Sequence, residues 1–304
     1  MEDLYFTLSD GARMRYGIYD PPGTPRATII VSPGRREFIE KKYAEIGQGF
    51  VERGFRVIIF DRRGQGLSDR LLGGTKRQRD HATDFDIFIR DFREFRAEVI
   101  AKYLVGPLLI TAHSMGGHLI TRCLVEMEDH GVSATILTSP MLALASLPAQ
   151  SLGMATSWIA AKFGHGDDYA LGQHDYGTQD RIFFQNPLTQ DPERFAIIDR
   201  YFTQNPNLVI GGVTWDWLHA ALRSIDTLQH RQYLGSLRIP FLTIMGSHDR
   251  VTPPGEVTPI LAMISQSEHV IIQGALHDVM NELEIYRKQA WAAIDAFLRK
   301  INLQ

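Results

Sequence analysis

The sequence predicts an α/β fold in which a mostly parallel sheet is covered by helices on both faces. Three observations support this prediction. The chain has 304 residues, which is long enough to bury a large core. Its strand-like segments are mostly continuous apolar runs, a pattern typical of strands that are buried on both faces. Stretches with helical periodicity separate these runs, and strand–helix–strand units place successive strands parallel to one another.

Eight segments have the composition of strands. The first two flank Asp10 and Gly11, a dipeptide that suits a tight hairpin because it accepts positive φ angles, so we expect the chain to open with antiparallel strands. The remaining six are rich in β-branched and apolar residues, and we expect them to be parallel. The eight segments are residues 6–8, 13–19, 27–32, 56–60, 107–111, 134–138, 240–245 and 268–273.

Helical stretches separate and follow these strands. In one of them, apolar residues recur at spacings of three and four, which predicts a helix with one face in the core. That face consists of Phe85, Phe88, Phe92, Phe95 and Val99. The other helices are expected over residues 37–53, over the residues that follow Ser114 up to about 128, and over a closing segment at 281–301.

The alternation of strands and helices stops between residues 141 and 232, where short helical segments are mixed with Gly, Pro, Gln and Asp. We therefore expect a core made of residues 1–140 and 233–304, with a helical cap inserted at 141–232. The first part of the cap is apolar, which fits either packing on the sheet or a surface that meets an acyl chain or a membrane. Its apolar residues are Met141, Leu142, Leu144, Leu147, Leu152, Met154, Trp158 and Ile159.

Charge and cysteine content exclude several classes of function. The 32 basic and 35 acidic residues give a net charge of −3, so the chain as a whole has no electrostatic affinity for nucleic acid. Cys123 is the single cysteine, which excludes an intrachain disulfide and a cysteine-rich metal site. The histidines and acids do not have the spacing of a hydrolytic metal site, so we expect no metal.

The sequence predicts a cytoplasmic location. Residues Met1 to Leu4 are acidic, whereas a secretory leader begins with basic residues before an apolar run. The longest uncharged stretch, Gly131 to Ala161, contains prolines and many hydroxyl groups, which disfavours a membrane-spanning helix. We therefore expect, at most, peripheral contact with the inner face of the membrane.

Ser114 has the sequence context of a nucleophile elbow. It lies in Ala112-His113-Ser114-Met115-Gly116, between an expected strand and an expected helix. In such a turn the serine hydroxyl projects above the strand ends, and small residues two positions before and after the serine relieve the crowding. The extra methyl group of Ala112, where glycine is usual, is tolerable there. We therefore predict that Ser114 is a nucleophile, with a simple helix N-cap serine as the alternative.

The base and the acid that such a serine needs are predicted from chain order. In folds with this elbow, the acid and then the histidine follow the serine, each on a loop after a strand. Asp249 follows the run at 240–245 and His277 follows the run at 268–273, so both loops should emerge beside Ser114. The alternatives for these roles are His113, His118, His248 and Asp278.

Two backbone N–H groups complete the predicted site. Acyl transfer needs donors that stabilise the negative oxygen of the tetrahedral intermediate. The residue after the nucleophile, Met115, supplies one N–H, and the loop after the strand at 27–32 should supply the other. Because Gly34 lets the backbone of that loop approach the substrate, we assign the second donor to the N–H of Arg35. The alternative for Gly34 is a plain turn glycine.

Taken together, these motifs resemble those of one family. The resemblance is to the α/β-hydrolase group of bacterial L2-type lysophospholipases, which is related to monoacylglycerol lipases, and it covers nearly the whole chain. The matching segments are Pro33-Gly-Arg-Arg-Glu37 through Lys42-Tyr-Ala-Glu45, Asp61-Arg-Arg-Gly-Gln-Gly-Leu-Ser68, His113-Ser-Met-Gly-Gly117, Gly211-Gly-Val-Thr-Trp215, Asp249 and His277. This chain departs from the family pattern at Ala112, where Gly is usual, and at Arg62, where His is frequent.

The resemblance implies an α/β-hydrolase fold with an eight-stranded sheet and a cap. It also implies a serine ester hydrolase that forms an acyl-enzyme, needs no cofactor and acts on single-acyl lipids. The rivals are a monoacylglycerol lipase, an esterase of small esters, an acyltransferase and a ligand-binding protein without turnover. The candidates for substrate contact are Gly34, Arg36, Trp158 and Trp215.

Local charge bears on the head group of the substrate. From Arg35 to Arg79 there are 12 basic and 6 acidic residues, a local balance of 12 − 6 = +6. This excess predicts attraction to a phosphodiester head group or to an anionic membrane, and the alternative is a solvated face. Arg36, Arg62 and Arg63 are the partners that Arg35 would have in such a contact.

Overall fold

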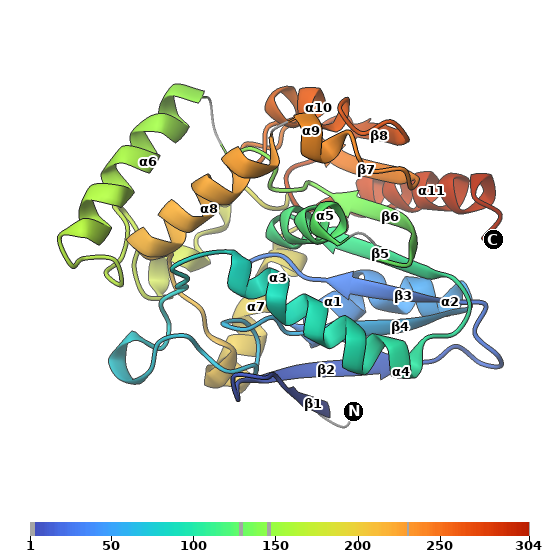
Figure 1. Ribbon diagram of the computed structural model, residues 1–304, viewed down its shortest axis with the longest axis horizontal. Coiled ribbons are helices and arrows are strands. Elements are labelled where there is room, and N and C mark those ends of the chain that lie inside the picture. Colours follow the sequence, from blue (N-terminus) through green and yellow to red (C-terminus); the bar gives the residue numbers. More distant parts are fainter. Residues whose placement is uncertain (1–3, 128–129, 145–146, 230, 304) are drawn as a thin grey trace.

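The computed structural model describes residues 4–127, 130–144, 147–229 and 231–303, and within these ranges it forms one eight-stranded sheet (Figure 1). The strands are β1 Leu4–Thr7, β2 Arg13–Tyr19, β3 Ala27–Ser32, β4 Phe55–Phe60, β5 Leu108–His113, β6 Val132–Thr138, β7 Phe241–Gly246 and β8 Ser267–Ile272. They lie side by side in the order β1-β2-β4-β3-β5-β6-β7-β8. β2 is antiparallel to both of its neighbours, and the other pairs are parallel. The predicted fold class is confirmed.

The first strand differs from its predicted bounds of 6–8. It begins earlier and ends at Thr7, because Leu8 belongs to the turn of the hairpin. The Leu8 N–H donates to Ala12 O, and the Gly11 N–H donates back to Leu8 O, both at 2.8 Å. Gly11 has a φ of +89°, the positive value that an Asp-Gly turn accepts.

Helices cover both faces of the sheet (Figure 1). One apolar core holds the predicted aromatic face of α3 together with side chains of α5 and α8, and a second core holds side chains of α1, α2 and α11. The helices are α1 Ile39–Lys42, α2 Gln48–Glu52, α3 Asp86–Phe95, α4 Ala101–Tyr103, α5 Met115–Glu126, α6 Leu147–Lys162, α7 Pro192–Gln204, α8 Trp215–Leu228, α9 Arg231–Leu234, α10 Pro254–Leu261 and α11 Glu284–Lys300.

The chain between β6 and β7 forms a helical insertion. Figure 1 shows α6 and α8 beyond one end of the sheet, with α6 the outer of the two. α6 packs against α8, and α8 buries Trp217, Ala221 and Ile225 in the same core as α3 and α5. The insertion therefore shares its apolar core with the sheet through α8.

The uncharged stretch Gly131 to Ala161 is divided between β6, the segment after it and most of α6. Among the described helices, none combines the length and the apolar composition that are needed to cross a bilayer. Residues 1–3, which include the acidic Glu2 and Asp3, lie outside the described residues, and so does the side chain of Leu147.

A tight turn follows β4 and packs against the edge of the site. Asp61 is fully buried there, and its carboxylate accepts hydrogen bonds from Arg15 Nη1 at 3.2 Å and from the backbone N–H groups of Ile39 and Leu67, both at 2.9 Å. Gly66 lies against this carboxylate with a φ of +52°, and a Cβ on it would be 2.0 Å from Asp61 Cγ. A side chain at position 66 would therefore displace Asp61 from its donors.

We predict that Gly66→Ala destabilises the fold more than Gly74→Ala does. Gly74 also has a positive φ, +58°, but a Cβ there would meet nothing within 4 Å. Gly74→Ala should cost about 1 kcal/mol from backbone strain alone. Gly66→Ala should cost roughly 2 kcal/mol more, because it also overpacks the Asp61 site. Urea unfolding of both variants measures the difference, and equal losses would mean that the turn adapts without strain.

Candidate active site

Ser114 lies at a sharp corner between β5 and α5. Its φ and ψ are +50° and −118°, a strained conformation that is typical of a nucleophile elbow. A Cβ on Gly116 would lie 2.4 Å from Pro33 O and 2.5 Å from Ser32 O, so this position requires glycine. Ala112 is buried in β5 opposite Ser32 and Leu137, and its methyl group fits there. The structure thus explains why residue 116 of the elbow is glycine and why alanine is accepted at position 112.

The structure brings the three residues predicted from chain order into one hydrogen-bonded series. His277, on the loop after β8, has its Nε2 3.0 Å from Ser114 Oγ. Its Nδ1 lies 2.8 Å from Asp249 Oδ2, on the loop after β7. All three side chains are buried. A histidine held in this way can accept the serine proton through Nε2 while its Nδ1–H donates to the acid.

Asp249 is held as an ionised acceptor. Its Oδ1 accepts hydrogen bonds from the N–H groups of Val251 at 2.8 Å and Thr252 at 2.9 Å, and its Oδ2 accepts from Thr252 Oγ1 at 2.8 Å. Burial alone would raise the pKa of Asp249, but the hydrogen bonds from His277 and Thr252 hold it below its usual value. Thr252 was not predicted, because its role depends on the turn that follows Asp249.

An oxyanion hole needs backbone N–H groups that do not already donate to the protein, and the N–H groups of Arg35 and Met115 meet this requirement among the described residues. Within the part of the chain that the structure describes, neither donates a hydrogen bond. By contrast, the Gly34 N–H donates to the Glu37 carboxylate, and the Arg36 N–H donates to Gln65 Oε1 at 2.8 Å. The N–H of Met115, at the first turn of α5, has no intrahelical acceptor.

Gly34 is required by close packing beside Ser114. A Cβ on Gly34 would lie 2.9 Å from His113 Cδ2 and 3.3 Å from Ser114 Cβ. Gly34 therefore acts through the close approach of its backbone and presents no side chain to a substrate. The sequence named Gly34 as a candidate substrate contact, whereas the structure shows that the position needs glycine because of the neighbouring side chains.

Ser114 and His277 open into a cavity of about 350 Å³. Its wall is formed by both apolar and charged side chains. The apolar side chains are Pro187, Leu188, Phe195, Ile198 and Val251. The charged side chains are Arg35, Arg36, Glu37, Lys41, Asp180, Arg194 and Asp278. An ester with one apolar and one polar end fits such a mixed lining.

Trp158 and Trp215 do not reach this cavity, so their assignment as substrate contacts is corrected. Among the described residues, the insertion contributes to the cavity through residues 176–198, which lie between α6 and α8. Trp158 is 51% exposed on α6, with Lys162 Nζ 4.8 Å from the centre of its ring. Trp215 begins α8 and packs against the main core.

The excess of basic residues near the oxyanion loop is largely neutralised by internal partners. Arg35 Nη1 and Arg36 Nε both donate to the carbonyl of Gly211, at 2.9 and 3.1 Å. Arg36 Nη1 also pairs with Asp180 at 2.7 Å, and Arg35 pairs with Asp80 at 3.6 Å. The family-like Gly-Gly segment thus anchors two arginines.

Arg62 and Arg63 are also engaged inside the protein. Arg62 donates to Gly34 O at 2.9 Å, and Arg63 Nε pairs with Asp91 at 2.8 Å. Neither lines the Ser114 cavity among the described residues. The expectation that Arg62 and Arg63 meet a phosphodiester is therefore wrong, because both side chains are buried and bonded to other parts of the protein.

A buried cluster of charges, which the sequence did not reveal, adjoins the cavity. Lys42 Nζ lies 2.7 Å from both Glu37 and Glu45, and Lys41 Nζ lies 3.1 Å from Glu37 and 3.3 Å from Asp278. Burial opposes ionisation of Glu37, but the ammonium groups of Lys42 and Lys41 outweigh it and lower its pKa to about 2. Asp278, which the sequence offered as an alternative for the acid or the base, is a member of this cluster.

The same cluster contains a possible set of metal ligands. Donor atoms of Glu37, His113 and Asp278 lie within 4.8 Å of one another. The ammonium groups of Lys41 and Lys42, however, already provide the positive charge beside these carboxylates. The residues present fit an internal ion cluster better than a metal site.

His113 and His118 are buried in neutral form. His113 Nδ1 lies 3.1 Å from Thr138 O, and His118 Nε2 lies 2.6 Å from Ser224 Oγ. Burial lowers the pKa of His113 to about 4 and that of His118 to about 3. Both side chains thus have structural partners other than Ser114 Oγ.

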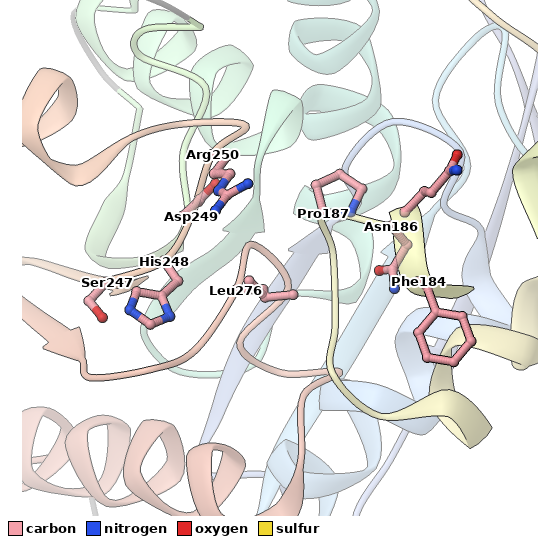
Figure 2. Close-up of a pocket in the computed structure, with 9 residues that line it drawn as sticks. Phe184, Asn186, Pro187, Ser247, His248, Asp249, Arg250 and Leu276 are labelled. Carbon is pink, nitrogen blue, oxygen red and sulfur yellow. The ribbon is translucent and has the colours of Figure 1, made fainter. Parts of the chain in front are cut away.

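His248 lines a different cleft, of about 620 Å³, together with other residues of the loop that carries Asp249. Figure 2 shows Ser247, His248 and Arg250 on one side of this cleft, with Phe184 and Pro187 of the insertion on the other. Pro187 also lines the Ser114 cavity, so it lies between the two hollows. His248 is therefore placed away from Ser114.

We predict that Asp249→Asn lowers kcat for p-nitrophenyl butyrate by a factor on the order of 10⁴, because the amide favours the wrong histidine tautomer. The neighbouring substitution His248→Gln is the control and should leave kcat within about threefold of the wild type. A similar loss in both variants would mean that the loop, and not the acid, controls turnover.

We predict that the two buried histidines make the protein less stable at acid pH. Their pKa values are lowered from 6.5 to about 4 and about 3, so in this range the unfolded chain binds more protons than the folded protein. Stability should therefore fall as the pH is lowered from about 6.5 towards 4. His118→Gln should reduce this fall, and His269→Gln, an exposed change on β8, serves as the control in urea unfolding at pH 7 and pH 4.5.

Comparison with known proteins extends these observations. The family model described as serine aminopeptidase, S33, matches residues 23–284. Lysophospholipase L2 of Escherichia coli is 28% identical over 90% of this chain and 81% of its own length. Monoglyceride lipase of Rattus norvegicus is 26% identical over 93% of this chain and 86% of its own length. These matches confirm the predicted resemblance.

Solved structures agree on the fold. A soluble variant of monoglyceride lipase from Saccharomyces cerevisiae, in complex with a substrate analogue, superposes with a TM-score of 0.76 at 19% identity. The match covers 99% of this chain and 95% of that chain. By its sequence match and its architecture, the chain belongs to the serine aminopeptidase S33 family and has the α/β-hydrolase fold.

Proposed function

We propose that the protein is a serine carboxylic-ester hydrolase that releases the fatty acid from single-acyl glycerophospholipids. The observation that carries this proposal is the series Ser114–His277–Asp249, with contacts of 3.0 and 2.8 Å, at the wall of a partly apolar cavity. The names of the similar proteins, lysophospholipase and monoglyceride lipase, support a lipid ester as the substrate.

In the first half of the reaction, Ser114 Oγ attacks the ester carbonyl carbon while its proton moves to His277 Nε2. The carbonyl oxygen becomes negative and accepts hydrogen bonds from the N–H groups of Arg35 and Met115. The intermediate then collapses, the bond to the glycerol oxygen breaks, and His277 gives its proton to that oxygen. The acyl group remains on Ser114.

In the second half, a water molecule gives a proton to His277 Nε2, and the oxygen of that water attacks the acyl carbon. The bond to Ser114 Oγ breaks, and His277 returns the proton to the serine as the fatty acid leaves. Asp249 stays ionised and holds the tautomer of His277 through Nδ1. The protein supplies every group that these steps need, so the proposal includes no cofactor.

The cavity suits a lipid with one acyl chain. Its apolar wall can hold the first part of that chain, since each buried methylene contributes about 0.8 kcal/mol. Four basic and three acidic side chains also line the cavity: Arg35, Arg36, Lys41 and Arg194 with Glu37, Asp180 and Asp278. A nearly balanced set of charges fits a zwitterionic head group as well as glycerol, so a monoacylglycerol is the second candidate substrate.

A substrate screen tests the proposal. The wild type should hydrolyse lysophosphatidylethanolamine faster than monooleoylglycerol, p-nitrophenyl butyrate or an amino-acid p-nitroanilide. Ser114→Ala should lower kcat by a factor on the order of 10⁶ and should abolish labelling by a fluorophosphonate.

Each other outcome of the screen points to a different function. A preference for the monoacylglycerol or the short ester indicates a lipase or an esterase, and transfer of the acyl group to an added alcohol indicates an acyltransferase. Unlabelled Ser114 in the wild type would indicate a binding protein without turnover, and faster cleavage of the p-nitroanilide would overturn the ester assignment.

We also propose that α6 makes peripheral contact with an anionic membrane at the inner face of the cytoplasmic membrane. Large apolar side chains are exposed along α6: Leu152 is 66% exposed, Ile159 is 48% exposed, and Phe163, just after the helix, is 74% exposed. This helix carries no acidic residue, and Lys162 lies over Trp158. A tryptophan beside a lysine on an apolar face suits the boundary between lipid head groups and acyl chains.

We predict that Leu152→Ser and Phe163→Ser each weaken binding to vesicles of phosphatidylethanolamine and phosphatidylglycerol about tenfold, because each side chain would bury part of its surface in lipid. Hydrolysis of p-nitrophenyl butyrate in solution should not change. Leu104→Ser, which alters an exposed leucine outside the insertion, is the control in a flotation assay. Equal binding by all three variants would leave α6 as an ordinary protein surface.

A further inference from the structure

The N–H of Arg35, the proposed second oxyanion donor, belongs to the peptide unit that joins Gly34 to Arg35. A trans peptide unit is planar, so its N–H and its C=O point in opposite directions. Within the described residues the structure has no cis peptide bond. A group that fixes the direction of the Gly34 carbonyl therefore also fixes the direction of the Arg35 N–H.

Arg62 holds that carbonyl. Its Nη2 donates to Gly34 O at 2.9 Å, and its Nη1 donates to the preceding carbonyl, Pro33 O. The same Nη2 lies 3.7 Å from Sδ of Met115, the residue that carries the other proposed donor. Arg62 is 4% exposed, and among the described residues it is not part of the wall of the Ser114 cavity. One buried side chain thus contacts both halves of the proposed oxyanion hole.

The two neighbouring peptide units are held as well. The Gly34 N–H donates to Glu37, and the Arg36 N–H donates to Gln65 Oε1 at 2.8 Å. Arg36 has a φ of +60°, a conformation that a non-glycine residue keeps only when its surroundings enforce it. Arg62 and Gln65 both come from the turn after β4, so that turn fixes the conformation of this loop.

We propose that Arg62 is a positioning residue of the oxyanion hole, whose guanidinium holds the Gly34–Arg35 peptide with its N–H directed at the carbonyl oxygen of an ester bound at Ser114. This inference rests on the proposed function and adds to it a residue that never touches the substrate. A second effect acts in the same direction. A cation bound to the carbonyl polarises the peptide unit, which makes its N–H a stronger donor.

The chemistry of arginine suits this task. Its planar fork can donate to two carbonyls that lie side by side, whereas a lysine donates from a single point. Burial lowers the pKa of Arg62 to about 10, so the side chain keeps its charge at neutral pH. Lysine at this position should therefore restore part of the effect, and an uncharged side chain of similar length should restore none.

The test compares Arg62→Met and Arg62→Lys with Arg63→Met. Arg63 is the neighbouring buried arginine, it pairs with Asp91 and Asp10, and no contact of its side chain with the oxyanion loop is found among the described residues. Each variant is assayed for kcat and KM on p-nitrophenyl butyrate. The inhibition constant is measured for an alkyl trifluoromethyl ketone, to which Ser114 adds to leave a negative oxygen in the hole. It is also measured for an alkyl methyl ether of the same chain length, which has no carbonyl carbon to attack and no negative oxygen.

For Arg62→Met we expect kcat to fall about 100-fold, the size of effect that follows loss of an oxyanion donor, while KM stays within about threefold. The inhibition constant of the ketone should rise by a similar factor, and that of the ether should not change. Arg62→Lys should recover about tenfold of the lost kcat. Arg63→Met should lower the midpoint of unfolding without these changes.

The inference is overturned if Arg62→Met keeps kcat and ketone affinity within about threefold of Arg63→Met. If Arg62→Met does not fold, Arg62→Lys decides, because a wild-type kcat in that variant would contradict a need for the fork. If the wild type itself hydrolyses none of the esters, the proposed function fails and the inference fails with it. If the wild type is active and the Arg62 variants have unchanged kcat and ketone affinity, the inference about Arg62 fails and the proposed function stands.

Discussion

The hydrogen bond between His277 Nε2 and Ser114 Oγ is the contact on which the proposed chemistry depends, and it exists because parallel strands end at one edge of a sheet. β5, β7 and β8 deliver Ser114, Asp249 and His277 to that edge from loops far apart in the sequence. A parallel sheet therefore does more than bury apolar side chains. It sets the distances between these loops, and packing on both faces prevents those distances from changing.

Buried charge then links the loops to one another. Glu37 accepts a hydrogen bond from Gly34 in the oxyanion loop, and through Lys41 it is connected to Asp278, the residue after His277. Charges in such a position are costly to desolvate, and the cost is offset only while every partner stays in place. The cluster therefore contributes less to net stability than to the relative position of the two loops. That role explains why so many ionised side chains lie beside a cavity whose wall is partly apolar.

The features that were predicted from the sequence are those encoded locally. Ser114, Asp249 and His277 each follow a recognisable strand, so their place at the sheet edge could be derived without coordinates. The cavity wall at 176–198 could not, because those residues reach Ser114 only through the path of the insertion. The same limit explains the misplaced Trp158 and the mistaken role of Arg62 and Arg63. A count of charges along the chain cannot register partners such as Asp91 that come from elsewhere in the sequence.

Arg62 and Arg63 show how adjacent residues of one type acquire unrelated roles. Both leave the turn after β4, but Arg63 points to carboxylates and is neutralised by them, whereas Arg62 Nη1 and Nη2 donate to two backbone carbonyls. A carbonyl has only a partial charge, so Arg62 forms no direct ion pair among the described contacts, and its buried charge is favoured only by the more distant carboxylates of Asp80, Glu37 and Asp61. Stability alone would not favour such a charge. It becomes favourable when a negative oxygen forms on the other side of the same peptide, and this is the physical reason to regard Arg62 as part of the site rather than of the scaffold.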